Sequence, residues 1–293
     1  MEVVIIGIVL LLKGVQGYFS KKLSGYLVDR LTYLSYLIYG LFVSAALAGG
    51  LALLQGESLR IDAATLGFSI LCGISMAICM VTNLIALKDG AVVLVQVFSM
   101  AGILIPCILG TFLFAESVSI LQFAGVAILL LSTCLLMQYS SGLYGKTTAK
   151  GILLLILVLV SNGTTMLAQK MFAFYIPDGN VSMFSFLSFG IPALALLPFQ
   201  GLTAKKEKRK VQMLPGKVLL IGGILAVTLL FVSQLSTVVS ATLPSVLVFP
   251  VVNGGGLILS SIIAAVFYRE KLTLRSIAGL ALGLAALMII NGC

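Results

Sequence analysis

A lysine stands within the first apolar stretch of the chain. Lys13 follows the uncharged run from Val3 to Leu12. If that run begins a membrane helix, the ammonium lies near the bilayer centre, where its insertion costs roughly 2.5–3.5 kcal/mol and a functional role is the first hypothesis. The alternative is that the helix begins later and that the side chain reaches a membrane surface. No Asp or Glu lies well inside an apolar stretch, so an ammonium in the bundle would either lose its proton more readily or attract an anion from outside the chain.

Two polar stripes follow helical spacing. Lys13, Gln16 and Ser20 fall on one helical face, and Asn162, Thr165 and Gln169 repeat the spacing later in the chain. Five more polar residues lie inside apolar segments: Asn83, Gln96, Ser99, Gln234 and Asn253. All eleven are candidate ligands of a polar solute. The alternative is hydrogen bonding between helices, worth about 0.6 kcal/mol per contact.

Composition decides the solvent that this chain requires. Of 293 residues, 60% are hydrophobic and 9% are charged, whereas soluble domains carry about 25% charged residues. Lipid therefore surrounds the protein, and apolar runs of about twenty residues indicate helices rather than barrel strands. The net charge of +9 is best explained by loop charges that set the topology, and we expect no nucleic-acid partner.

Enzymatic chemistry finds no support in the residue types. The chain has no His, and its five Cys are scattered singly without metal-ligand spacing. A membrane enzyme would need clustered acids or histidines for metal and acid–base work. We therefore predict no enzyme activity, no metal and no cofactor.

Ten apolar segments are long enough to cross a membrane. The first lacks a basic region before it and a cleavage pattern after it, so we interpret it as a membrane helix and not a signal peptide. The fold class predicted is an all-α integral membrane protein with helices at 3–23, 32–54, 64–87, 91–114, 119–138, 151–174, 182–200, 217–239, 243–267 and 273–291.

The chain repeats itself. The pattern from Gly14 to Lys21 aligns with that from Gly163 to Lys170, and the turn at Glu116 aligns with the turn at Glu270. We expect each glutamate to cap the helix that follows it. Two halves, 1–145 and 146–293, then carry five helices each. Because five is odd, the halves must run in opposite senses, as in transporters built from inverted repeats.

Loop charges orient the chain. Nearly all Lys and Arg residues follow odd-numbered segments, including the run from Lys205 to Lys210, whereas Arg60 lies on the other side. These loops are therefore expected in the cytoplasm, with both termini outside the cell membrane. The spacing of Gly279 and Gly283 suits either packing within the bundle or a dimer contact, so both a monomer and a homodimer are compatible with the sequence.

The paired Gly-x6-Lys and Glu patterns resemble the drug/metabolite transporter superfamily, in its ten-helix EamA-like branch. The segment from Val252 to Thr273 is also similar to the last two helices of small multidrug resistance proteins. Those relatives place an acidic residue midway along helix 1, where this chain has Lys13. The branch often has Pro at the positions of Ile103 and Leu257, which would displace any helix kink here.

The resemblance implies a secondary transporter that moves a small polar organic metabolite by alternating access. The solute is expected to be anionic if Lys13 lines the cavity. Two alternatives are a multidrug or cation exporter and a membrane subunit that scrambles lipids or serves a structural role. The predicted partners are a small solute and the lipid bilayer.

Overall fold

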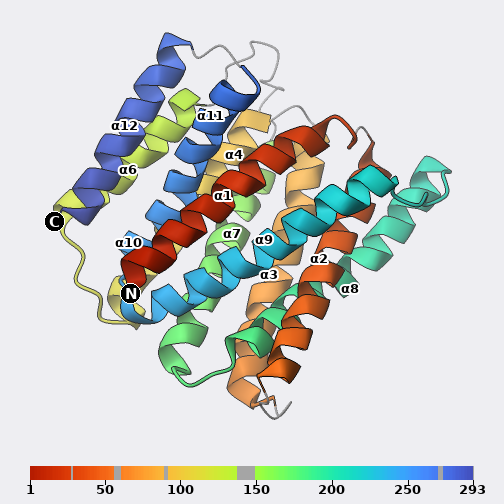
Figure 1. The fold of residues 1–293 in the computed structure, drawn as a ribbon, viewed down its shortest axis with the longest axis horizontal. Helices are drawn as coiled ribbons and strands as arrows, with labels where there is room; N and C mark the ends of the chain where they lie inside the picture. Colours follow the sequence, from red (N-terminus) through yellow and green to blue (C-terminus); the bar gives the residue numbers. More distant parts are fainter. Residues whose placement is uncertain (28, 56–60, 89–91, 137–148, 270–272, 293) are drawn as a thin grey trace.

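The computed structural model describes residues 1–27, 29–55, 61–88, 92–136, 149–269 and 273–292 (Figure 1). In these ranges the regular structure is helical throughout. The elements are α1 (Glu2–Ser24), α2 (Arg30–Leu54), α3 (Ala63–Lys88), α4 (Val92–Ala101), α5 (Leu104–Leu113), α6 (Ile120–Leu136), α7 (Ala149–Tyr175), α8 (Val181–Glu207), α9 (Gly216–Thr242), α10 (Ser245–Pro250), the π-helix η1 (Val251–Gly255), α11 (Gly256–Phe267) and α12 (Leu274–Asn291).

These elements make ten spans, which confirms the predicted fold class. Nine apolar stretches of the described residues are long enough to cross a membrane, and the shorter α6 is the tenth. The fourth span is divided into α4 and α5, and the ninth into α10, η1 and α11. The predicted limits agree within a few residues except for α8, which continues seven residues past the predicted end at residue 200, to Glu207. The predicted boundary between the halves, at 145/146, lies outside the described residues.

Each interrupted span has a proline nearby. Pro106 lies in the first turn of α5, so it cannot donate to the carbonyl of Gly102, and the helix breaks between Ala101 and Leu104. The sequence predicted that any kink would be displaced from Ile103, because no proline stands there. The break nevertheless falls at Ile103, because a proline disrupts the helical turn that precedes it. In the ninth span, the π-helix follows Pro250 directly.

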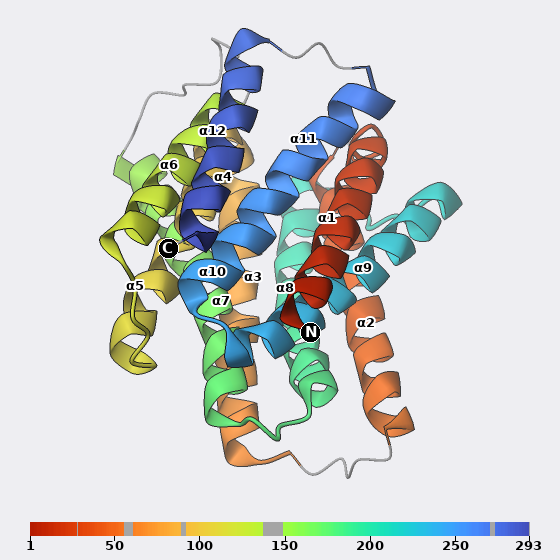
Figure 2. The ribbon, with the colours of Figure 1, turned by 60° about the vertical axis from the view of Figure 1, so that its left-hand side comes forward.

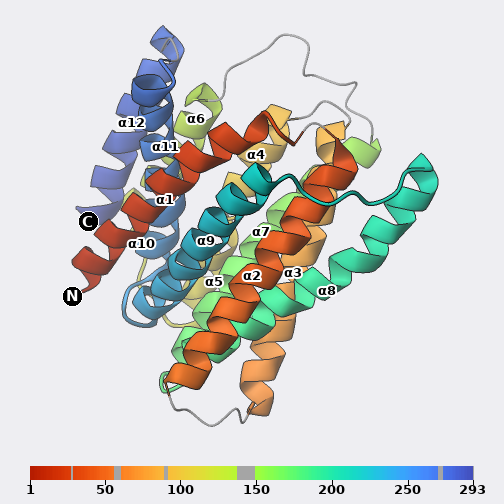
Figure 3. The same ribbon diagram turned by 45° about the vertical axis from the view of Figure 1, so that its right-hand side comes forward.

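The helix contacts obey an approximate twofold exchange of the halves. α6 packs on α12 at one edge of the molecule, and α2 packs on α8 (Figures 1 and 2). The pairing of α3 with α7 has its counterpart in α9 with α1, and that of α5 with α7 in α11 with α1. Each half therefore places its first helix among helices of the other half, and the two halves interlock (Figure 3).

Small residues bring the first helix of each half close to its partner. A Cβ atom at Gly14 would lie 2.9 Å from Leu259 of α11, and one at Gly17 would meet the hydroxyl of Ser260. In the other half, a Cβ atom at Gly163 of α7 would collide with the carbonyl of Gly102. Such contacts are available only to helices without side chains at these points.

The glycines of α12 pack inside the bundle. A Cβ atom at Gly279 would lie 3.0 Å from Leu136 of α6, and Ser132 of α6 donates a hydrogen bond of 2.7 Å to the carbonyl of Gly279. Gly283 also faces Ser132. Their spacing is thus explained by the contact between α6 and α12, and they provide no argument for a dimer.

Candidate functional site

Lys13 lies midway along α1 and is half-buried. Its alkyl chain packs over Gly256, the first residue after the π-helix, where the Cβ, Cγ and Cδ atoms fill the space that a side chain would take. Across the described residues, its ammonium makes no hydrogen bond and no ion pair. The lysine therefore stands at the interruption of the ninth span with its stem packed and its charge uncompensated.

The rest of the α1 stripe also lacks polar partners in the described part of the chain. Gln16 is half-buried, Ser20 is exposed, and neither makes a side-chain hydrogen bond there. The polar atoms of this stripe are therefore available to a solute.

The equivalent stripe on α7 is occupied by contacts within the protein. Asn162 donates a 2.7 Å hydrogen bond to the carbonyl of Ser99, and Gln169 donates one of 3.0 Å to the hydroxyl of Ser233. Thr165 bonds back to the carbonyl of Ser161 in its own helix, at 2.9 Å. The two symmetry-related stripes therefore differ. Side chains of the α7 stripe form hydrogen bonds to other helices, whereas those of the α1 stripe form none in the described residues.

The remaining candidates are dispersed among the helices. Gln234 bonds to Ser182 at 3.2 Å, and Asn253, in the π-helix, bonds to the carbonyl of Phe249 at 3.0 Å. Asn83 donates to the Sγ of Cys79 at 3.5 Å, while its carbonyl oxygen is buried without a partner. Gln96 is exposed. Among the eleven candidates, only Ser99 and Asn162 are joined by a hydrogen bond in the described residues.

A buried ion pair escaped the sequence analysis. The ammonium of Lys170 lies 2.7 Å from the carboxylate of Glu116, and the side chains are 3% and 7% exposed. Lys170 also donates to the carbonyls of Ser240 and Leu243 at 2.6 and 3.0 Å. The repeat aligns Lys21 with Lys170 and Glu116 with Glu270, so it marked both members of the ion pair. The sequence does not show that Glu116 and Lys170 are in contact, because they are far apart along the chain.

Glu116 does not cap the helix that follows it, so that expectation was wrong. Its carboxylate accepts from the backbone N–H of Ser245 at 2.9 Å, at the start of α10 in the other half. The following helix, α6, has its own capping box: Ser119 and Gln122 each accept from the other's backbone N–H, at 3.1 and 3.0 Å. The matching expectation for Glu270 falls outside the described residues.

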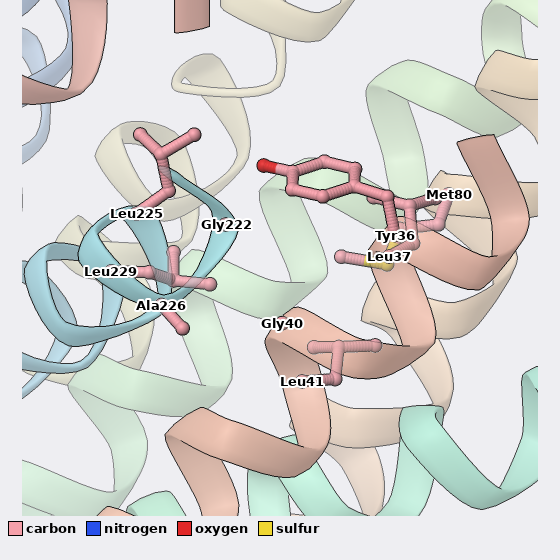
Figure 4. A pocket seen from close by; sticks show the side chains of 9 residues that line it. All are labelled: Tyr36, Leu37, Gly40, Leu41, Met80, Gly222, Leu225, Ala226 and Leu229. Atoms are coloured by element: carbon pink, nitrogen blue, oxygen red, sulfur yellow. The ribbon is translucent and has the colours of Figure 1, made fainter. Parts of the chain in front are cut away.

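One small cavity opens between α2, α3 and α9 (Figure 4). Its volume is about 50 Å³, well below the ~300–1,000 Å³ of pockets that hold drug-sized ligands. Tyr36 reaches across it from α2 toward α9, and Tyr39 donates to the carbonyl of Leu219 at 3.1 Å. The other lining residues are Leu37, Gly40, Leu41, Met80, Gly222, Leu225, Ala226 and Leu229. None of the eleven candidates lines this cavity.

In the described residues, no group of His, Cys, Asp and Glu side chains could hold a metal ion. The eleven candidates are a lysine, amides and hydroxyls, which can bind a polar solute through charge and hydrogen bonds. The architecture is that of two interlocked five-helix halves with broken helices, as in secondary transporters.

Residues 149–292 match the model of the EamA-like transporter family. The second half of this chain is an EamA-like transporter domain. The apolar helices of the described residues make the chain a multi-pass membrane protein. Its first half repeats the Gly-x6-Lys and Glu patterns of the half that matches the family.

A solved structure shares the overall fold of this chain. A structure described as "Crystal structure of protein" superposes with a TM-score of 0.76 at 17% sequence identity, covering 98% of this chain and 95% of that one. At this identity the match supports the fold alone. Among curated proteins, no sequence matches the chain.

Proposed function

We propose that this protein is a secondary transporter that carries a small polar organic anion across the cytoplasmic membrane by alternating access of its two halves. The match of residues 149–292 to a transporter family supports the class of function. The anionic character of the solute rests on one observation: the ammonium of Lys13 has no partner among the described residues.

Lys170, a second lysine inside the bundle, shows which partners a buried cation has in this protein. Lys170 meets a carboxylate and two carbonyls, as a buried cation requires. Lys13 lies midway along its span and has no comparable set of partners in the described part of the chain. A carboxylate or phosphate of a solute would supply the missing counter-charge.

The position of Lys13 also suits a solute site. Transporter sites form near the membrane midplane, where helices are discontinuous. α1 packs against both η1 and α11, and the stem of Lys13 covers Gly256 at their junction. In our proposal, Lys13 binds the anion, and Gln16, Ser20 and Asn253 supply hydrogen bonds from α1 and η1.

The amide candidates that bond to neighbouring helices have a smaller part in this proposal. Asn162, Gln169 and Gln234 would hold the bundle together in this conformation and reach the solute only after rearrangement. The unit of function is a monomer or homodimer with both termini outside the cell.

A thermal-shift screen of the purified protein tests the anion hypothesis. The ligands are succinate, inorganic phosphate, glutamate and choline, and the proteins are the wild type, Lys13→Met and Lys22→Met. Methionine keeps most of the alkyl stem that packs on Gly256 and removes the charge. Lys22 is an exposed lysine at the end of the same helix and serves as the matched control.

We expect at least one of the anions to raise the melting temperature of the wild type and of Lys22→Met, but not that of Lys13→Met. A ligand present at a hundred times its dissociation constant adds about 2.7 kcal/mol to the native state. Stabilisation of all three proteins by choline alone would overturn the proposal in favour of a cation exporter. If the four ligands leave all three proteins unchanged while the protein scrambles lipids in vesicles, the alternative of a lipid-scrambling subunit replaces it.

A further inference from the structure

The ion pair of Lys170 and Glu116 joins the two halves of the protein. Glu116 follows α5 in the first half, whereas Lys170 on α7, the carbonyls of Ser240 and Leu243 and the N–H of Ser245 all belong to the second. The first half thus contributes the only carboxylate of the cluster, and the second half contributes the cation and every other polar partner named here. We call these five residues the clasp.

The backbone before Glu116 is shaped to bring its carboxylate back over α5. Ala115 has a φ of 51°, in the left-handed region that residues other than glycine rarely adopt. The N–H of Glu116 then donates to the carbonyl of Gly110 at 3.3 Å. A Cβ atom at Gly110 would collide with the Glu116 carboxylate, so the absence of a side chain there is what makes room for it.

The clasp lies at one end of the bundle. α5, α7 and α9 end there and α10 begins there, so all the clasp residues lie at or near helix termini. The ring of Phe114 covers the ammonium of Lys170, with the nitrogen 5.4 Å from the ring centroid. Cys107 is fully buried, and its Sγ lies 3.9 Å from the carbonyl of the clasp residue Ser245. If α5 moved away from α7 and α10 at this end, Glu116 and Lys170 would lose each other and Cys107 would lose its cover.

We propose that the clasp is a gate: Glu116 and Lys170 hold this end of the transporter closed and separate when the transporter opens there. The inference rests on the proposed function only in requiring a transporter that opens at one end, and it makes no use of the charge of the solute. The alternative is a permanent staple that stays intact in every state.

The turn after α11 repeats the backbone conformation of the turn after α5, at the opposite end of the bundle. Arg269, the residue aligned with Ala115, has a φ of 52°. Tyr268 aligns with Phe114 and donates to the carbonyl of Tyr18 on α1 at 2.8 Å. Burial raises the pKa of Tyr268, and the charge of Lys21, which aligns with Lys170, opposes that shift. Related turns at opposite ends of the two halves fit a transporter that opens at each end in turn.

The test measures how fast Cys107 reacts with a fluorescent maleimide in protein reconstituted into nanodiscs, where both faces are accessible. The other four cysteines are replaced by Ser. The variants are Glu116→Gln, Lys170→Met and the double variant, which removes both charges together and stays informative if a single variant fails to fold. Lys170→Arg, which keeps the charge and the donors, is the conservative variant.

A second reporter distinguishes opening from general loosening. Cys79 of α3 is also buried, and it is kept as the sole cysteine in a parallel series. It lies beside Asn83, on the part of α3 away from the clasp. Opening at the clasp should leave its reaction unchanged, whereas partial unfolding should accelerate both reporters.

For a gate, Glu116→Gln and Lys170→Met should each speed the labelling of Cys107 by about tenfold or more, because removing one partner leaves the other charge uncompensated in the closed state. Cys79 should be unaffected, and Lys170→Arg should react like the wild type. The proposal is overturned if every folded variant labels Cys107 at the wild-type rate, or if Cys79 accelerates equally. Either result leaves the anion hypothesis to be decided by the thermal-shift screen.

Discussion

Two lysines within the bundle have opposite surroundings. Lys170 meets an anion and two carbonyls and is almost completely buried, whereas Lys13 is half-buried and packs only its carbon chain. Both are lysines in apolar helices, so their residue type does not separate a structural cation from one left for a ligand. Their partners do, because a buried charge is stable only when it is compensated.

Short-range hydrogen bonds fix several helix starts at the residue scale. Asp29 accepts from the N–H of Thr32 at 3.0 Å, and Asp62 accepts from the N–H of Thr65 at 2.8 Å, in the same Asp-x-x-Thr arrangement. The hydroxyl of Thr32 also donates to Asp29, at 2.7 Å. Each carboxylate satisfies an N–H that the first turn of the helix leaves unpaired.

We expect Asp29→Ala to lower the free energy of unfolding by about 0.5–2 kcal/mol near neutral pH. The pKa of Asp29 is lowered by the N–H and the hydroxyl of Thr32 and, more weakly, by Arg209. A carboxyl group with a lowered pKa stabilises the fold above its unfolded pKa of about 3.9, and this stabilisation disappears as the pH falls through the folded pKa. The difference in melting temperature between wild type and variant should therefore narrow below about pH 4.

The exposed Asp178 offers the control, since it lies outside the helices. Asp178→Ala should leave the melting temperature within experimental scatter at every pH. If Asp29→Ala lowers the melting temperature by the same amount below pH 4 as at neutral pH, Asp29 caps the helix without the help of its charge.

At the scale of elements, close helix packing depends on positions that have no side chain. α1 presents Gly14 and Gly17 to α11, and α11 presents Gly256 to Lys13. We call this close contact between α1 and α11 a seam. The equivalent seam in the other half joins Gly163 of α7 to Gly102, between α4 and α5. In lipid, where apolar surface gains nothing by leaving solvent, van der Waals contact and interhelical hydrogen bonds hold such pairs together.

Enlarging Gly17 should separate α1 from α11. We expect Gly17→Val to lower the melting temperature markedly, because the new side chain would meet the hydroxyl and backbone of Ser260. Gly7→Ala on the same helix is the matched control: a Cβ atom there has nothing within 4 Å, so the change should be neutral or slightly stabilising. Equal melting temperatures for Gly17→Val and wild type would contradict this prediction, because they would show that α1 and α11 can move apart without loss of stability.

The whole molecule combines an inverted repeat with an exchange of first helices between halves. α1 packs on α9 and α11, and α7 packs on α3, α4 and α5. Any movement of one half against the other therefore acts on both seams and on the clasp. On the proposed topology both termini lie at the clasp end, because the spans alternate in direction. Glu116, Leu243 and the C-terminus each follow an outward-going span, and the N-terminus precedes an inward-going one.

The topology itself is open to measurement. We expect alkaline phosphatase fused after Gly292 to be active and a green fluorescent protein fused after Lys210 to fluoresce, because basic loops remain in the cytoplasm. The reciprocal fusions supply the controls. An active phosphatase after Lys210 would reverse the orientation and move the clasp to the cytoplasmic end.

The sequence by itself determined the solvent, the ten spans, the repeat and the family resemblance, because apolar length and recurring motifs are properties of the chain taken in order. It also singled out Lys13. Only the tertiary structure decided which polar residues are used: Asn162 and Gln169 bond to other helices, whereas Lys13 does not. It alone revealed that Glu116 meets Lys170 and Ser245, since these contacts depend on how the two halves interlock, and no spacing along the chain encodes that.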